Sequence, residues 1–295
     1  MDDRRPTIAI DSRSSFIRDS VLPYLGVRPI GFLNSLRLYA GYSIALCGKG
    51  FRPSAESAVG AAVPGRSLLT VSFLDIMAQV RPGTNDLDLL VHHEPKTLSW
   101  FRVGAGEVVV DVGAHIGRYT LLAAKSGAKV ISIEPDPSNF QLLESNVRLN
   151  GFNGVALHRV ALSNAAGVRE LILSSGTNRG TSSFVTNHGR SDPSCQTSER
   201  IPVDCITLDD LSDAEGLRRI DWLKIDVEGH ESEVLEGAVR SLRNTKNLIL
   251  EVTAGNEQAC RQRLGQAEFD LKAVEPGYPA SNWLLVKGSC RLHTS

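Results

Sequence analysis

Three ionisable side chains, Asp226, Glu228 and His230, alternate along the stretch Lys-Ile-Asp-Val-Glu-Gly-His-Glu at positions 224–231. The apolar residues before them predict a strand that ends near Asp226, and ligands bind at the carboxyl ends of strands in open α/β sheets. An imidazole can take a proton near neutral pH, and a carboxylate can orient the imidazole or act as the base itself. We therefore predict Asp226, Glu228 and His230 as candidate catalytic residues.

Two other interpretations of this stretch stay open. In one, Asp226 or Glu228 holds a divalent cation that acidifies a hydroxyl group, although no metal ligand is assigned on these grounds. In the other, Glu228 and Glu231 only favour the N-terminus of the following helix, and His230 is merely exposed. Lys224 alternates with Asp226 on the predicted strand, and we expect it to pair with a carboxylate.

A second stretch carries the pattern Asp-x-Gly-x-x-x-Gly, formed by Asp111, Gly113 and Gly117. The β-branched run at 108–110 precedes it and is typical of a buried parallel strand, and a helical apolar pattern follows it. A strand, a tight glycine turn and a helix place free N–H groups and the positive end of the helix dipole at the edge of the sheet. Nucleotides bind at such an edge.

Glu134 ends the next predicted strand, at 129–134, so its carboxylate would lie beside the glycine turn. There it can accept hydrogen bonds from two ribose hydroxyls. The glycine spacing differs from the Gly-x-Gly-x-x-Gly of dinucleotide sites, which weakens an interpretation as an NAD site. S-adenosylmethionine, a nucleoside without a pyrophosphate, fits the pattern better. Plain turn chemistry for the glycines and a helix-capping charge for Glu134 remain the alternative.

His92, His93 and Glu94 are adjacent and have side chains that zinc or iron accepts as ligands. Adjacent residues of an extended segment point to opposite faces, and no further His or Cys pair at ligand spacing lies nearby in the sequence. We therefore expect a solvated loop at 92–94 rather than a metal site.

These candidate residues need a sheet whose strands end at one edge. Apolar runs predict strands at 108–112, 129–134, 155–160, 220–226 and 248–252, with helical patterns between them. This alternation predicts a parallel, right-handed, doubly wound α/β sheet. Further predictions are a helix at 68–80, a strand at 86–91, a hairpin-like stretch from 161, one amphipathic helix after Gly229, and a lid or binding loop at 174–194. For that loop, disorder without function is the alternative.

The first 80 residues carry no motif with a clear chemistry. We expect a partly helical N-terminal extension at 1–80 before a catalytic domain at 81–295, with a linker-like stretch at 60–65. The apolar run at 30–47 is interrupted by polar residues and glycines, so it predicts one or two packed helices rather than a membrane span. Peripheral membrane contact is the alternative that this run leaves open.

Composition places the chain among globular proteins. The 295 residues include 42% hydrophobic and 22% charged side chains, with a net charge of −1. No basic excess points to nucleic acid, so we expect no nucleic-acid partner. The five cysteines are widely spaced, odd in number and without a Cys-x-x-Cys pair, which fits a reducing compartment. Because no apolar signal-peptide core follows the first residues, we expect a cytoplasmic location.

Several motifs together resemble the FkbM-type methyltransferase family. They are Asp-Val-Gly-Ala-His-Ile-Gly from 111, Ile-Glu-Pro at 133–135, Val-Ala-Leu-Ser at 160–163, Lys-Ile-Asp-Val-Glu-Gly-His-Glu at 224–231 and Leu-Glu-Gly-Ala at 235–238. The resemblance extends over residues 81–255. It implies a mostly parallel seven-stranded sheet of the Rossmann-like class I methyltransferase type. It also implies S-adenosylmethionine-dependent O-methylation of a small-molecule or glycan hydroxyl, commonly in secondary metabolism.

The same resemblance implies roles for the cofactor residues. It puts Asp111, Gly113 and His115 around the methionine part of the cofactor, Glu134 at the ribose, Ala161 near the adenine, and Gly117 and Tyr119 along the cofactor cleft. His115 stands where the family usually has Asn. Two other functions stay open, namely an NAD(P)-dependent oxidoreductase and a non-catalytic nucleotide-binding module.

Overall fold

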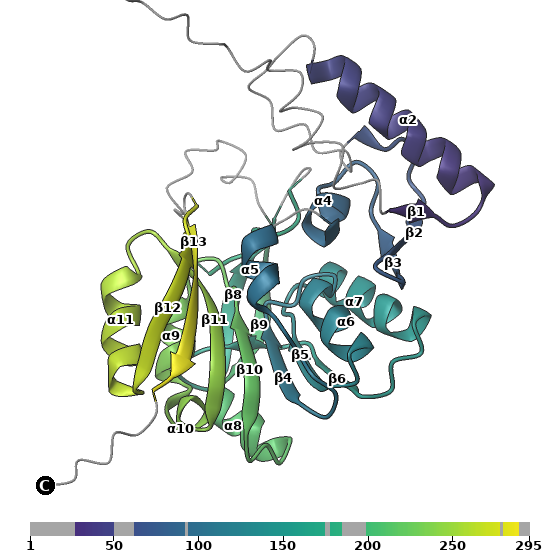
Figure 1. The fold of residues 1–295 in the computed structure, drawn as a ribbon. Coiled ribbons are helices and arrows are strands. Elements are labelled where there is room, and N and C mark those ends of the chain that lie inside the picture. Colours follow the sequence, from purple (N-terminus) through teal and green to yellow (C-terminus); the bar gives the residue numbers. More distant parts are fainter. Residues whose placement is uncertain are drawn as a thin grey trace, which may run out of the picture.

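The computed structural model describes residues 27–49, 62–91, 94–174, 178–184, 199–277 and 280–288 (Figure 1). His92, His93, the start of the predicted linker and much of the predicted loop at 174–194 lie outside these ranges.

Seven strands form the central sheet, in the order β12-β13-β11-β10-β4-β5-β6 (Figure 1). All of them run parallel except β13, which is antiparallel to both of its neighbours. The predicted doubly wound, mostly parallel seven-stranded sheet is therefore confirmed. The strands are β4 (Val108–Val112), β5 (Lys129–Ile133), β6 (Val155–His158), β10 (Ile220–Ile225), β11 (Thr245–Thr253), β12 (Phe269–Glu275) and β13 (Ala280–Lys287).

Helices cover both faces of this sheet because successive strand residues point to opposite sides. Val110 and Leu223 lie in a hydrophobic core with the helices α8 to α11. Val109 and Trp222, their neighbours on the same strands, lie in a second core that includes Ala123 of α6. The helices are α6 (Arg118–Lys125), α7 (Pro137–Leu149), α8 (Leu208–Ala214), α9 (Glu231–Glu236), α10 (Val239–Arg243) and α11 (Glu257–Gln266).

A hairpin stands where the sequence predicted a helix at 68–80. The strands β2 (Leu69–Phe73) and β3 (Ile76–Val80) pair antiparallel around Leu74 and Asp75. Both turn residues have positive φ values, of 47° and 55°, which match a tight hairpin turn. Every second residue of each strand is buried. The helix prediction is wrong because the apolar residues recur here with a period of two.

The N-terminal elements share a core with the main domain. β1 (Arg28–Pro29) adds to β2, and α2 (Phe32–Lys49) confirms the predicted helix at 30–47. One hydrophobic cluster joins Leu38 of α2, Ile76 of β3 and Leu143 of α7. Asn146 of α7 also accepts a hydrogen bond from the Gln79 N–H at 2.7 Å. The division at residue 80 stays a prediction. Within the described ranges, no helix combines the length and the hydropathy that a membrane crossing needs.

Local hydrogen bonds explain why residues 86–91 form α4 (Asp86–Val91) and not the predicted strand. The Asp86 N–H donates to the Thr84 hydroxyl at 3.2 Å, and the Asn85 carbonyl accepts from the Leu89 N–H at 2.9 Å. The buried Asp86 carboxylate binds the Arg81 guanidinium at 2.7 Å. These bonds hold the first turn of a helix despite the alternating apolar pattern.

The helix predicted after Gly229 is divided into α9 and α10 at Gly237. A Cβ at Gly237 would lie 2.1 Å from the carbonyl oxygen of Ser163, so only glycine fits at this break between the two helices. The prediction of one helix is wrong in this respect. The hairpin-like stretch is confirmed, because β7 (Ala161–Leu162), β8 (Gly167–Ile172) and β9 (Arg200–Ile206) form a separate three-stranded sheet.

Candidate active site

The turn after β4 has no room for a side chain at Gly113. Its φ is +78°, and a Cβ there would lie 1.7 Å from the carbonyl oxygen of Asp226. The Gly113 N–H donates to the Ile133 carbonyl at 3.0 Å. Gly117, with a φ of +105°, begins α6, and a Cβ on it would lie 2.7 Å from a methyl group of Leu143. The glycine turn is thus fixed against both neighbouring strand ends.

Glu134 lies directly after β5, beside this turn, and is buried. One carboxylate oxygen accepts from the His115 N–H at 2.8 Å, and the other accepts from the Asp136 N–H at 3.0 Å. Burial raises the pKa of Glu134 to about 7, although both N–H groups oppose this effect. The Asn139 side chain also hydrogen-bonds to Glu134, and an ionised carboxylate can accept about four hydrogen bonds in all, so it can still accept from ribose hydroxyls.

His115 takes part in the turn through its main chain. Its φ is +52°, in the left-handed region. Its Nε2 lies 3.5 Å from the Arg81 guanidinium and 3.7 Å from Asp86 Oδ1. Burial lowers the pKa of His115 to about 4, so the ring is neutral at pH 7.

Asp111 and Ala161 make contacts inside the fold. Asp111 accepts a hydrogen bond from the Thr120 hydroxyl at 2.6 Å, which ties α6 to β4, and burial raises its pKa to about 6. Ala161 packs with Leu171 and Cys205 in the core of the three-stranded sheet. The cofactor contacts expected of these two residues stay predictions.

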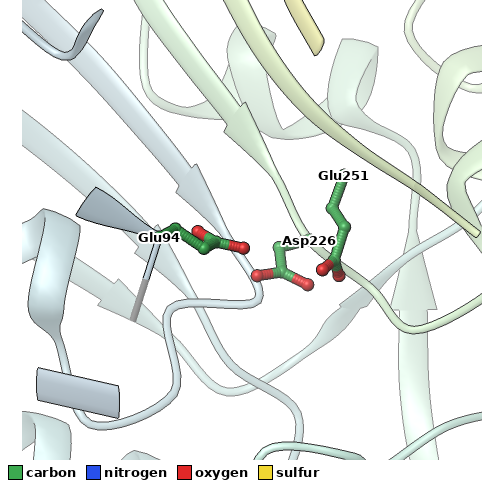
Figure 2. Close-up of side chains that lie close together, drawn as sticks. All are labelled: Glu94, Asp226 and Glu251. Carbon is green, nitrogen blue, oxygen red and sulfur yellow. The ribbon is translucent and has the colours of Figure 1, made fainter. Parts of the chain in front are cut away.

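Asp226 is one of three carboxylates that converge at the carboxyl edge of the sheet (Figure 2). One oxygen each of Glu94, Asp226 and Glu251 lie within 4.8 Å of one another. Asp226 follows β10, Glu251 belongs to the adjacent β11, and Glu94 immediately precedes α5 (Pro95–Trp100). We call these three residues the carboxylate cluster. The prediction of a solvated loop is wrong for Glu94, whose side chain points at the other two carboxylates.

A buried ammonium balances part of this charge. Lys224 Nζ donates to Asp226 Oδ2 at 3.0 Å, which confirms the predicted pairing. Burial works against both charges, but the Lys224 ammonium holds the pKa of Asp226 below its ordinary value, and Asp226 and Glu94 keep that of Lys224 raised. Burial and the Asp226 charge raise the pKa of Glu251 well above its ordinary value. Asp226 is therefore the ionised member of the Asp226–Glu251 pair.

Two side chains orient the Glu94 carboxylate. The Tyr119 hydroxyl donates to Glu94 Oε2 at 3.2 Å, and Asn282 Nδ2 donates to Glu94 Oε1 at 2.6 Å. The Tyr119 ring packs edge-on against Phe101, with ring centres 5.1 Å apart. Tyr119, predicted along the cofactor cleft, thus lies between the glycine turn and the carboxylate cluster.

The other two predicted catalytic residues lie along the same loop but in different surroundings. Glu228 has a φ of +50°, and its carbonyl accepts from the Ser183 hydroxyl at 2.7 Å. His230 is 3% exposed, so the interpretation as an exposed side chain is wrong. Its Nε2 lies 3.0 Å from the Ser163 hydroxyl, its ring packs on Phe184, and burial lowers its pKa. A catalytic role for His230 stays a prediction.

Residues 178–184 form hydrogen bonds with the segments that follow β5 and β10. The Ser182 hydroxyl donates to Asp136 Oδ2 at 2.9 Å, and the Ser183 hydroxyl donates to the Glu228 carbonyl. The described part of the predicted loop at 174–194 therefore spans the edge at which both candidate sites lie.

Sequence reasoning missed the carboxylate cluster as a unit. Glu94 stood in a motif that was interpreted as solvated, and Glu251 was visible only as a carboxylate near the end of a strand. Asn282 gave no signal of its own. These residues come from separate elements. The pairing of β11 with β10 and β13 brings Glu251 beside Asp226 and Asn282, and Glu94 joins them from the start of α5 by accepting a hydrogen bond from Asn282.

The strand order and the helices on both faces of the sheet define a Rossmann-like α/β protein. The model of the methyltransferase FkbM domain matches residues 111–274, which is more than half of the chain. The chain belongs to the FkbM methyltransferase family.

Curated relatives agree with this assignment. Methyltransferase sdnD of Sordaria araneosa is 31% identical over 154 residues, covering 44% of this chain and 59% of the relative. The 31-O-demethyl-FK506 methyltransferase FkbM of Streptomyces tacrolimicus is 32% identical, covering 45% and 59%. The hexuronic acid methyltransferase AglP of Haloferax volcanii is 29% identical, covering 50% and 57%. The match thus spans less than two thirds of the length of each of these relatives.

Proposed function

We propose that this chain transfers a methyl group from S-adenosylmethionine to a hydroxyl oxygen of a small molecule or glycan. Family membership supports methyl transfer. The observation that carries the proposal is the close approach of Gly113 to the main-chain carbonyl of Asp226, which places the residue that bears the ionised carboxylate next to the glycine turn. When bound, S-adenosylmethionine supplies a methyl group on a positively charged sulfur.

The glycine turn and Glu134 fit such a nucleoside. Glu134 would hold the ribose hydroxyls, and the turn at Gly113, His115 and Gly117 would lie against the methionine part. The glycines let the turn pack tightly against the neighbouring strand end and α7, and the carboxylate that accepts from its His115 N–H lies next to it. Asp111 would support the turn through Thr120.

Asp226 is the best candidate for the base. An alcohol that attacks a methyl group in line with the departing sulfur must lose its proton during or after the attack. Asp226 keeps its charge because Lys224 lies 3.0 Å away, and its side chain remains 28% exposed. Glu228 would face the acceptor from the following residues. His230 would act through Phe184 and Ser163, as a residue that positions the loop.

Two relatives support the proposed acceptor class. The printed names of two of them state a hexuronic acid and 31-O-demethyl-FK506 as the methylated compounds. We infer that the acceptor of this chain is likewise a hydroxyl-bearing glycan or secondary metabolite and not a nucleic acid. A cytoplasmic location is part of the same proposal.

Ligand binding and product detection test the proposal separately. S-adenosylhomocysteine should raise the unfolding temperature, whereas NAD should not. Incubation with S-adenosylmethionine and a metabolite extract should give products heavier by one methylene group, detected by mass spectrometry. Stabilisation by NAD alone would support an oxidoreductase instead. Binding without any methylated product across extracts would support a non-catalytic module.

A further inference from the structure

We propose that Glu94, Asp226, Glu251 and Asn282 bind one divalent cation of the hard, oxygen-preferring kind, such as Mg²⁺ or Mn²⁺. The inference rests on the proposed function, because the cation would lie beside the acceptor hydroxyl. It concerns the carboxylate cluster and the amide that touches it.

The distances within the cluster suit a single ion. Mg²⁺ binds oxygen at roughly 2.1 Å, so two ligands on opposite sides of it are about 4.2 Å apart. The three carboxylates already present one oxygen each within 4.8 Å of one another. Shifts of a few tenths of an ångström would complete the ion's inner contacts, and open positions would remain for water or an acceptor oxygen. Oxygen-only ligands favour Mg²⁺ or Mn²⁺ over zinc.

Asn282 supplies an observation independent of the acidic residues. It stands opposite Glu251 in the β11–β13 pair, so both side chains lie on the same face of the sheet. Its Nδ2 lies 2.6 Å from Glu94 Oε1, which places the amide at the cluster. The residue is 5% exposed, and its buried carbonyl oxygen has no hydrogen-bond partner.

A bound cation would give this oxygen a partner. A half-turn of the amide exchanges Nδ2 and Oδ1, which brings the carbonyl oxygen to the position beside Glu94. Without a cation this orientation would set two acceptor oxygens against each other. With a cation between them, both oxygens become ligands. An unpartnered buried carbonyl is costly, and after the half-turn a cation beside Glu94 would remove this cost.

The charges of the cluster lead to the same conclusion. Three carboxyl groups face one ammonium, that of Lys224, so acidic groups outnumber basic groups at the cluster. Arg118 and Glu228 add one charge of each sign at longer range. A divalent ion would balance the remaining charge.

The cation would help the reaction by acidifying the acceptor hydroxyl. The hydroxyl proton would pass to a carboxylate of the cluster as the new oxygen–carbon bond forms and the sulfur–carbon bond breaks. The sulfur would keep the electron pair of the broken bond. No further reactant is needed.

Binding of Mn²⁺ can be measured without knowing the acceptor. The full chain, freed of metal with EDTA, would be titrated with Mn²⁺ and followed by electron paramagnetic resonance. We expect one site per chain, which Mg²⁺ competes for. Glu251→Gln should weaken binding by at least about tenfold and Asn282→Ala by less, since the first removes a charged ligand. Asp213→Asn, which removes an exposed carboxylate paired with Arg240, should bind like the wild type.

Two results would overturn the cation site. One is the absence of Mn²⁺ binding at millimolar concentration, and the other is equal binding by Glu251→Gln and Asp213→Asn. Should Glu251→Gln not fold in a thermal unfolding test, Glu94→Gln takes its place. Calorimetry with S-adenosylhomocysteine on the same sample separates the two proposals. Cofactor binding without Mn²⁺ binding would remove the cation and leave the methyltransferase proposal intact, whereas Mn²⁺ binding without cofactor binding would do the reverse.

Discussion

The glycine turn, with Glu134 beside it, and the carboxylate cluster lie at the same edge of the sheet, but they are built in different ways. Glu134 is held by main-chain N–H groups of His115 and Asp136, which are close to it in the chain or on the adjoining turn. The cluster has Asp226 bound by the side chain of Lys224 and Glu94 bound by that of Asn282. A network of side chains loses its geometry when any one member is replaced. A main-chain N–H donor remains when its own side chain is replaced.

This difference predicts two separate kinds of failure. Changes at the turn should affect folding and cofactor affinity, and changes at the cluster should affect turnover. The Gly113–Asp226 contact is the point at which the two regions meet, so a change there should affect both.

Gly113→Ala should have the largest effect. A Cβ would lie 1.7 Å from the Asp226 carbonyl, and the backbone would have to move. We expect a loss of about 3 kcal/mol or more in the free energy of unfolding, together with loss of S-adenosylhomocysteine binding. Urea denaturation and calorimetry measure the two.

Gly106→Ala is the matched control for this substitution. Gly106 has a similar φ, of +76°, but nothing lies within 4 Å of its Cβ position. Gly106→Ala should therefore lose only about 1 kcal/mol of the free energy of unfolding, because it shares the backbone strain of Gly113→Ala but not the close contact. Equal losses in the two variants would show that the close contact at Gly113 is unimportant.

Asp226→Asn should lower turnover by about 10²–10⁴-fold, because the amide has the same shape but cannot take a proton. The affinity for S-adenosylhomocysteine should change by less than about threefold, since the turn keeps its donors. Methyl transfer under saturating cofactor measures the first and calorimetry the second. Asp221→Asn, at the other end of β10, serves as control and should leave turnover unchanged. A parallel loss of cofactor affinity in Asp226→Asn would break the separation of the two regions.

Glu134→Gln should show the opposite pattern. Hydrogen bonds to a charged acceptor contribute about 1.5–3 kcal/mol, so affinity for S-adenosylhomocysteine should fall roughly 10–100-fold. Turnover at saturating cofactor should be retained. Glu144→Gln, which alters an exposed carboxylate of α7 paired with Arg148, should leave affinity unchanged. An unchanged affinity in Glu134→Gln would remove Glu134 from the cofactor site.

The glycine turn was predictable because its residues lie close together in the chain. Gly113, Gly117 and Glu134 each belong to a local pattern of strand, turn and helix, and the fold class follows from repeating that pattern. The seven-stranded sheet was confirmed as predicted. The cluster was not predictable, because the pairing of β11 with β13 brings Glu251 and Asn282 together and a contact between residues far apart in the chain adds Glu94.

The errors in secondary structure have local causes as well. The stretch at 69–80 is apolar enough for a helix, and only its period of two and the turn at Leu74 and Asp75 distinguish a hairpin. The stretch at 86–91 alternates like a strand, but the bonds of Asp86 to Thr84 and Arg81 form a helix start. Both errors therefore concern local features, namely a turn and a helix start, that overall apolar content or alternation does not reveal.

Affinity for S-adenosylhomocysteine should rise with pH. Burial raises the pKa of Glu134 to about 7, and only the ionised carboxylate accepts both ribose hydroxyls. At pH 6 about a tenth of the carboxyl groups are ionised, so affinity should be roughly tenfold lower than at pH 8. Calorimetry across this range should show proton release on binding. The Glu134→Gln variant is the control and should be flat.

The same raised pKa predicts how the free energy of unfolding of the cofactor-free protein changes with pH. Because the folded pKa of Glu134 exceeds the unfolded value, its contribution is present below pH 4 and is lost as the pH rises through about 7. Affinity for the cofactor and stability of the free protein should therefore change in opposite directions across pH 6–8. A pH-independent affinity in the wild type would contradict the ribose role.

His115→Asn should have the smallest effect. Asn adopts the left-handed conformation readily, and the N–H that Glu134 accepts belongs to the main chain. Affinity should change by less than about threefold, because the lost ring only lies near Arg81 and Asp86. His115→Val keeps the N–H but puts a β-branched residue at a φ of +52°, so it should lose about 1–2 kcal/mol of stability. A loss of affinity well above threefold in His115→Asn would show that His115 contributes its imidazole, and not only its main chain, to the turn.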